Sequence, residues 1–167
     1  MISLHDLAYT IILFIPAMVS NGSATLISRG RPLDLGKFFI DGRRILGDGK
    51  TLEGFFLGLY YGVSFVITIG VIKEDPGLIE LGLGSCLGAL IGDIIGSFIK
   101  RRLGMERGKK APILDQLDFA IGATLFMMLL GARLAFVNLI IVYILIYILH
   151  VYTNKLAYYL GLKNVPW

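Results

Sequence analysis

The chain has 167 residues, of which 56% are hydrophobic, 17% are charged and one is cysteine, and its formal net charge is +4. The single cysteine, Cys86, excludes an internal disulfide and any site built from several cysteines. The hydrophobic share exceeds the ~45–50% apolar content of soluble domains. The even alternation of a transmembrane barrel is absent, so we predict an all-α polytopic membrane protein.

Five apolar runs predict five transmembrane helices within one membrane domain, residues 1–167. They occupy residues 4–20, 52–72, 78–99, 113–130 and 134–152. We separate the last two at Gly131, because one helix over about forty residues would be roughly 60 Å long, twice the hydrocarbon thickness. Long loops at 21–51 and 100–112 connect the helices, and a short tail runs from Thr153 to Trp167.

Basic residues are distributed unevenly between the two sides of this arrangement. Only Lys73 and Arg133 lie on one side, whereas the two long loops and the tail hold the other fourteen: Arg29, Arg31, Lys37, Arg43, Arg44, Lys50, Lys100, Arg101, Arg102, Arg107, Lys109, Lys110, Lys155 and Lys163. The positive-inside rule therefore predicts cytoplasmic loops, a cytoplasmic C-terminus and an outside N-terminus. We expect a multi-pass cell-membrane protein whose site faces the cytoplasm.

Small residues form a stripe along the third predicted helix. Gly84, Gly88, Gly92 and Gly96 recur every fourth residue and so share one face. Such a stripe lets helices approach closely in lipid, either inside one chain or between subunits of a possible homodimer. Asp93 lies among these glycines, and an ionisable residue in a span is a functional candidate. The alternative for Asp93 is a structural partner for a basic residue near the boundary.

Charges of both signs gather where the third helix ends and the fourth begins. Their spacing places each set on one helical face: Asp93, Ser97, Lys100 and Arg101 on the third helix, and Asp115 and Asp118 on the fourth. If the faces meet, three carboxylates and two cations converge, which suits Mg²⁺ bound together with substrate phosphates. The alternative, a basic loop anchored to anionic headgroups, leaves the aspartates unexplained.

The first long loop places glycine beside charge in two segments. These are Asp41-Gly42-Arg43-Arg44 and Gly47-Asp48-Gly49-Lys50-Thr51. Glycine lets backbone N–H groups approach phosphate oxygens, and arginine offers them a bidentate fork. A Walker A loop is excluded, because its first glycine would fall at Arg44 and no strand precedes it. The alternative is a solvated loop that only sets topology.

Two motifs carry a resemblance to a known family. Ser97-Phe98-Ile99-Lys100-Arg101 followed by Asp115-Gln116-Leu117-Asp118 resembles the signature of membrane CTP-dependent phosphatidate cytidylyltransferases, S-x-hydrophobic-K-R and then D-R-hydrophobic-D, with Gln116 in place of the arginine. The segment RGRPLDLGKFFIDGRRILGDGKTLEG resembles more specifically the CDP-archaeol synthases, an archaeal branch with five spans.

The resemblance implies transfer of CMP from CTP to an isoprenoid ether-lipid phosphate, giving CDP-archaeol and pyrophosphate. Membrane lipids are expected as surroundings, with no nucleic-acid partner. It implies an Mg²⁺ site at Asp93, Asp115 and Asp118, with Lys100, Arg101, Asp115 and Asp118 catalytic. Substrate contacts are expected from Arg43, Arg44, Asp48, Lys50, Ser97, Lys109 and Lys110. Two alternatives stay open: a CDP-diacylglycerol synthase acting on phosphatidic acid, and a small ion-coupled transporter.

Overall fold

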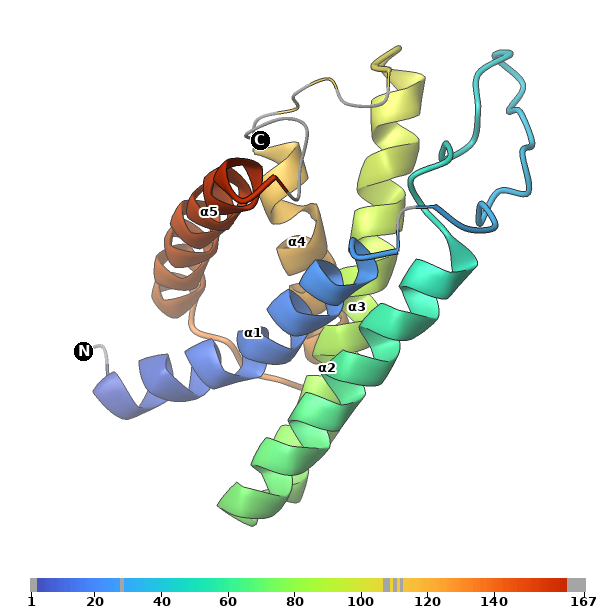
Figure 1. The fold of residues 1–167 in the computed structure, drawn as a ribbon. Helices are drawn as coiled ribbons and strands as arrows, with labels where there is room; N and C mark the ends of the chain where they lie inside the picture. The colour runs from blue at the N-terminus through green and yellow to red at the C-terminus, as the bar shows by residue number, and fades with distance from the viewer. Residues whose placement is uncertain (1–2, 28, 107–108, 110, 112, 162–167) are drawn as a thin grey trace.

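The computed structural model describes residues 3–27, 29–106, 109, 111 and 113–161. Within these ranges the chain forms five helices: α1 (Leu4–Ala24), α2 (Leu52–Lys73), α3 (Pro76–Arg102), α4 (Leu114–Leu129) and α5 (Phe136–Tyr159) (Figure 1). The only β pairing in the described residues consists of two isolated bridges inside the first loop, Pro32 with Thr51 and Phe38 with Arg44. The all-α prediction is therefore confirmed for this part of the chain.

Four of the helices are long and apolar enough to cross a membrane: α1, α2, α3 and α5, with 21 to 27 residues each. The fourth predicted span, α4, has 16 residues and reaches only about 24 Å at ~1.5 Å per residue. The molecule is a multi-pass membrane protein whose short helix α4 is packed against longer neighbours.

Several helix ends differ from the predicted spans. Helix α3 continues through the basic residues to Arg102, and α5 continues to Tyr159, where a tail had been expected from Thr153. The extension of α5 has a physical reason, because no glycine or proline interrupts the chain before Gly161, whose φ of 71° suits a helix C-terminus. The turn between α2 and α3 is tight because Asp75 accepts a hydrogen bond from the Leu78 N–H and Pro76 opens α3.

The glycine stripe of α3 packs against α4 inside the chain. A Cβ atom added at Gly88 would lie 2.8 Å from the backbone carbon of Gly122, and one added at Gly92 would lie 3.0 Å from the Gly122 Cα. Gly84 faces Leu130 at one end of the crossing, and Gly96 faces Asp118 at the other. The stripe is thus an intramolecular contact surface, and a homodimer would use another face.

A second glycine stripe, on α2, was not identified in the sequence analysis. A Cβ atom at Gly54 would lie 2.9 Å from the Ile27 carbonyl oxygen, and Gly58 and Gly62 lie against the Ser20 region of α1. Helices α1, α2 and α3 therefore also approach closely. The apolar core lies between α1, α3, α4 and α5, where Phe14, Phe119 and Ile146 are at most 2% exposed.

The substitution Gly88→Ala tests the α3–α4 crossing. The added methyl would overlap the backbone of Gly122, which cannot rotate away, so we expect a loss of about 1–3 kcal/mol of stability. Gly22→Ala in α1 is the matched control, because nothing lies within 4 Å of that position. Thermal unfolding in detergent measures both, and equal melting temperatures for the two variants would contradict the crossing.

Candidate functional site

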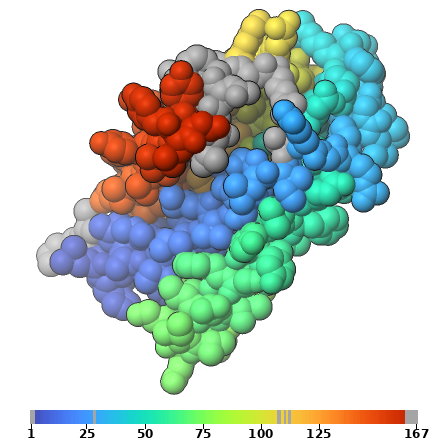
Figure 2. Space-filling view, in the orientation of Figure 1, coloured from blue at the N-terminus to red at the C-terminus, as the bar shows by residue number. Residues whose placement is uncertain are grey.

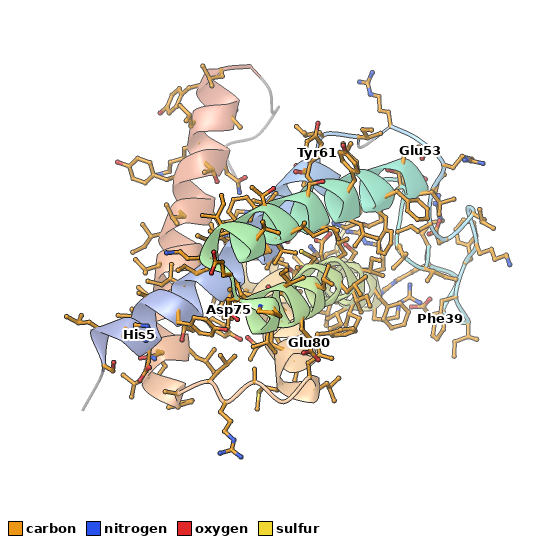
Figure 3. The ribbon with its side chains drawn as sticks, turned by 90° about the horizontal axis from the view of Figure 1, so that it is seen from below. His5, Phe39, Glu53, Tyr61, Asp75 and Glu80 are labelled. Carbon is orange, nitrogen blue, oxygen red and sulfur yellow. The ribbon has the colours of Figure 1, made fainter. Side chains whose placement is uncertain are left out.

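The charged residues singled out in the sequence lie at one end of the helix bundle. The first loop, the end of α3 and the beginning of α4 lie together at this end (Figure 1). Figure 3 shows Glu53 and Phe39 on this side of the molecule, away from His5 and Asp75. The first loop and the connection from α3 to α4 therefore lie at the same end of the bundle. This is expected, because α2 leads away from that end and α3 returns to it.

Two lysine–aspartate ion pairs form the centre of the site. Lys50, from the first loop, donates to Asp93 on α3. Lys100, at the end of α3, donates to Asp115 Oδ1 on α4 at 2.7 Å and lies 3.9 Å from Asp118 Oδ2. Asp93 is close enough to Asp118 for the two carboxylates to repel each other. The three predicted aspartates thus gather around two lysines.

Asp118 is the most deeply buried of the three carboxylates, with a side chain 4% exposed. Its Oδ1 accepts a hydrogen bond from the Phe119 N–H at 2.7 Å, whereas its buried Oδ2 has no hydrogen-bond partner. The carboxylate fits only because position 96 is glycine, since a Cβ there would lie 2.7 Å from the Asp118 Cβ. A buried carboxylate oxygen without a hydrogen bond is costly, so Oδ2 is available to a ligand.

The beginning of α4 is shaped by its own polar side chains. Asp115 Oδ2 accepts a hydrogen bond from the Ala111 N–H at 2.8 Å, and Gln116 Oε1 accepts one from the Ile113 N–H at 2.7 Å. Ile113 has a φ of 73°, which is unusual for a β-branched residue. Gln116 therefore caps this tight turn, where the related signature has arginine.

Hard oxygen ligands make the site compatible with a divalent cation. No three His, Cys, Asp or Glu side chains within the described ranges form a ready-made metal cluster. The lone Oδ2 of Asp118 beside Asp93 nevertheless fits Mg²⁺, which retains waters and takes one or two protein carboxylates plus substrate phosphates.

The first loop is organised by Asp34, a residue that the sequence analysis missed. Its fully buried carboxylate accepts hydrogen bonds from the Arg44 side chain and from the N–H groups of Gly36, Leu46 and Gly47, at 2.8–3.2 Å. Burial alone raises the pKa of Asp34, but these bonds more than offset it and hold the pKa well below its usual range. The only local signal was Asp34-Leu35-Gly36, an Asx-turn pattern.

A second set of contacts docks the first loop onto the end of α3. The Arg102 side chain bonds Asp41 Oδ1 at 3.0 Å and the Arg44 carbonyl oxygen at 2.6 Å. Its guanidinium carbon lies 4.7 Å from the centre of the Phe39 ring and 4.9 Å from that of Phe98. In return, Arg43 donates to the Arg102 carbonyl oxygen at 2.8 Å. These contacts position the part of the loop that carries Lys50.

The other predicted substrate contacts lie outside the central pairs. Arg44 bonds Asp34 and Asp48, and Arg43 bonds the end of α3. Ser97 is buried. Lys109 forms an exposed pair with Glu106 at 3.9 Å. Arg101 belongs to the last turn of α3, and Lys110 lies outside the described residues, as do Arg107, Lys163 and Trp167.

Comparison with known proteins finds relatives over almost the whole length of the chain. The family model described as CarS-like, CDP-archaeol synthase, matches residues 1–167. A CDP-archaeol synthase of Sulfolobus acidocaldarius is 47% identical over 160 residues, 94% of this chain and 96% of that protein. One of Saccharolobus islandicus is 46% identical over 166 residues, 98% of each chain.

A solved structure described as an intramembrane enzyme for archaeal membrane lipid biosynthesis matches with a TM-score of 0.82. It is 40% identical, and the match covers 87% of this chain and 92% of that one. The fold, with its four long apolar helices, defines a polytopic membrane protein. The chain belongs to the CDP-archaeol synthase family, which confirms the resemblance found in its motifs.

The substitution Asp34→Asn tests the organisation of the first loop. It removes the charge that Arg44 and three backbone N–H groups share, and hydrogen bonds to a charged group are each worth about 1.5–3 kcal/mol. We expect hydrogen exchange at Gly36, Leu46 and Gly47 to accelerate at least tenfold. Asp6→Asn, at an exposed aspartate in α1, is the control and should leave these amides unchanged.

The pH dependence of the same amides has a defined sign. Because the folded-state pKa of Asp34 is lowered, its stabilising contribution is complete above the ordinary carboxyl pKa of about 3.9 and is lost as the pH falls below it. Protection should stay constant from neutral pH down to about pH 5 once intrinsic exchange rates are corrected. If the hydrogen-exchange protection of these amides already fell between pH 7 and pH 5, the lowered pKa of Asp34 would be contradicted.

Proposed function

We propose that this chain transfers CMP from CTP to an unsaturated archaeal ether-lipid phosphate, 2,3-bis-O-geranylgeranylglycerol 1-phosphate, giving CDP-archaeol and pyrophosphate. The observation that carries the proposal is the pairing of Lys50 with Asp93 and of Lys100 with Asp115 beside buried Asp118, in a chain of this family. Family membership favours this reaction over the transporter and over a synthase acting on phosphatidic acid.

The reaction needs charge neutralisation more than proton transfer. A phosphate monoester has a second pKa near ~6 and is already ionised at neutral pH, so its oxygen attacks without a general base. It forms a bond to the α-phosphorus of CTP while the bond from that phosphorus to the bridging oxygen of pyrophosphate breaks. Because every partner is anionic, positioned cations supply most of the stabilisation.

Lys50 and Lys100 are the cations best placed for this role. Both are mostly shielded from water, with side chains 23% and 14% exposed, and low exposure strengthens their interaction with phosphate oxygens. We assign Lys100, with Arg101 in the same turn, to the leaving pyrophosphate or the lipid phosphate. Lys50 closes the site from the first loop.

The aspartates are proposed to hold Mg²⁺. Asp93 and Asp118 would be its principal protein ligands, with Asp115 assisting once Lys100 turns to substrate. The ion would offset the negative charge of the CTP phosphates. We place this end of the bundle in the cytoplasm, because CTP arrives from water and most basic residues of the sequence lie in the loops at this end.

A direct assay tests the proposed reaction. Purified protein in mixed micelles, given CTP labelled in its cytosine, should form a labelled CDP-lipid and equimolar pyrophosphate from the geranylgeranyl ether-lipid phosphate. Formation should require Mg²⁺ and stop on addition of EDTA. Faster turnover of diacyl phosphatidic acid would instead assign the chain to ester lipids, and solute flux in sealed vesicles without pyrophosphate release would support a transporter.

The substitution Asp118→Asn tests the metal assignment. It keeps the size of the side chain and removes its charge, so we expect CMP transfer to fall by roughly 10²–10³-fold, as for loss of one preorganised electrostatic contact. Melting temperature should stay near that of the parent protein, because the change also removes a buried charge.

Glu80→Gln is the matched control for this experiment. Glu80 is an exposed carboxylate near the beginning of α3, labelled beside Asp75 and apart from Phe39 in Figure 3, and its loss should leave CMP transfer unchanged. Near-parental activity of Asp118→Asn, measured beside this control, would show that Asp118 does not hold the metal.

A further inference from the structure

An apolar groove runs between α1 and α5, outside the charged site. Its volume is about 550 Å³, and all of its lining residues are apolar, among them Ile11, Ile15 and Val19 of α1 and Leu145, Ile148 and Leu149 of α5. The surfaces of these two helices lie next to each other on one face of the molecule (Figure 2). Because α1 and α5 are both long and apolar enough to cross a membrane, we expect this groove to face hydrocarbon.

The groove continues into a second hollow of about 290 Å³, called here the polar hollow because polar side chains join its apolar lining. Both share Met18, Ile146 and Leu149 as lining residues, and the polar hollow adds Asn21, Thr25, His150, Thr153 and Asn154. Polarity therefore increases in one direction along α1 and α5, toward the end of the bundle that holds the charged site. An amphiphile lying in the groove would place its polar head at this end.

The polar hollow also reaches the helix that carries the buried aspartate. Phe119 of α4 forms part of its wall, and the Phe119 N–H donates to Asp118 Oδ1. The ring of Phe119 lies 6.0 Å from that of His150 on α5. The polar hollow and the charged site therefore lie on two sides of one turn of α4.

We propose that the α1–α5 groove binds a hydrocarbon chain of the lipid-phosphate substrate, with the polar hollow receiving its glycerol end. This inference rests on the proposed function. The lining of the groove on α1 extends over nine residues, Ile11 to Val19, or about 13 Å of helix. An apolar groove of this length, which becomes more polar toward the charged site, fits a hydrocarbon chain joined to a polar head.

The substitution Leu145→Trp tests the groove by filling it with an apolar side chain. Leu145 lines the groove and is 41% exposed. We expect the KM for the geranylgeranyl lipid phosphate to rise about tenfold, the equivalent of losing contact with roughly two methylenes. The KM for CTP and the kcat at saturating lipid should stay unchanged, and an analogue with truncated chains should show a smaller rise.

Ile144→Trp is the matched control. Ile144 is the preceding residue of α5, is 54% exposed and does not line either hollow, so its KM for lipid should equal that of the parent. Equal lipid KM values for the two tryptophan variants, or a parallel rise in the KM for CTP, would overturn the groove assignment.

A second measurement separates this inference from the proposed reaction. A lipid phosphate with a photoreactive group in its chain should label peptides of α1 and α5, and Leu145→Trp should reduce that labelling while Ile144→Trp does not. Labelling confined to the exposed face of α2, near Phe56 and Tyr60, would overturn the groove. Labelling of α1 and α5 that depends on the hydrocarbon chain of the lipid, without CMP transfer, would uphold lipid binding and refute the proposed reaction.

Discussion

The close crossing of α3 and α4 is the contact on which the rest of the structure depends. In lipid there is no hydrophobic force between helices, so association relies on close van der Waals packing and on small residues that permit it. Gly88 and Gly92 of α3 meet Gly122 of α4 at backbone distance. This contact holds α4, which is shorter than its neighbours, and brings Asp118 against Gly96. Without it, no carboxylate of α4 would reach the cations of α3.

A buried carboxylate brings an electrostatic cost that the surrounding structure has to offset. Desolvating one ion costs several kcal/mol, and Asp118 also faces the charge of Asp93. Lys100 comes from the same bundle, but Lys50 comes from the first loop. The loop can deliver Lys50 because Asp34 orders it internally and Arg102 docks it. The balance of charge in the site therefore depends on the ordered conformation of the first loop.

The sequence predicted the parts of this structure that depend on local periodicity. The helices follow from apolar runs, and the stripe of α3 follows from glycine at every fourth position. The gathering of Asp93 and Asp118 follows from helical faces that meet. The role of Asp34 was not predictable, because three of its four partners lie ten to thirteen residues away in a loop without periodicity. Arg102 likewise depends on a long-range contact between the loop and α3.

The ion pairs at the site also bear on how its ligands would be coupled. Lys50 and Lys100 each hold an aspartate, so a phosphate that attracts a lysine leaves a carboxylate without its counter-charge. That carboxylate then gains affinity for a cation, and by linkage a cation bound there increases the affinity for phosphate by the same factor. In the proposed reaction, opposite charges already paired in a partly dehydrated site would thus favour joint binding of nucleotide and Mg²⁺ over either alone. The same pairing lets the site stay folded before any substrate enters.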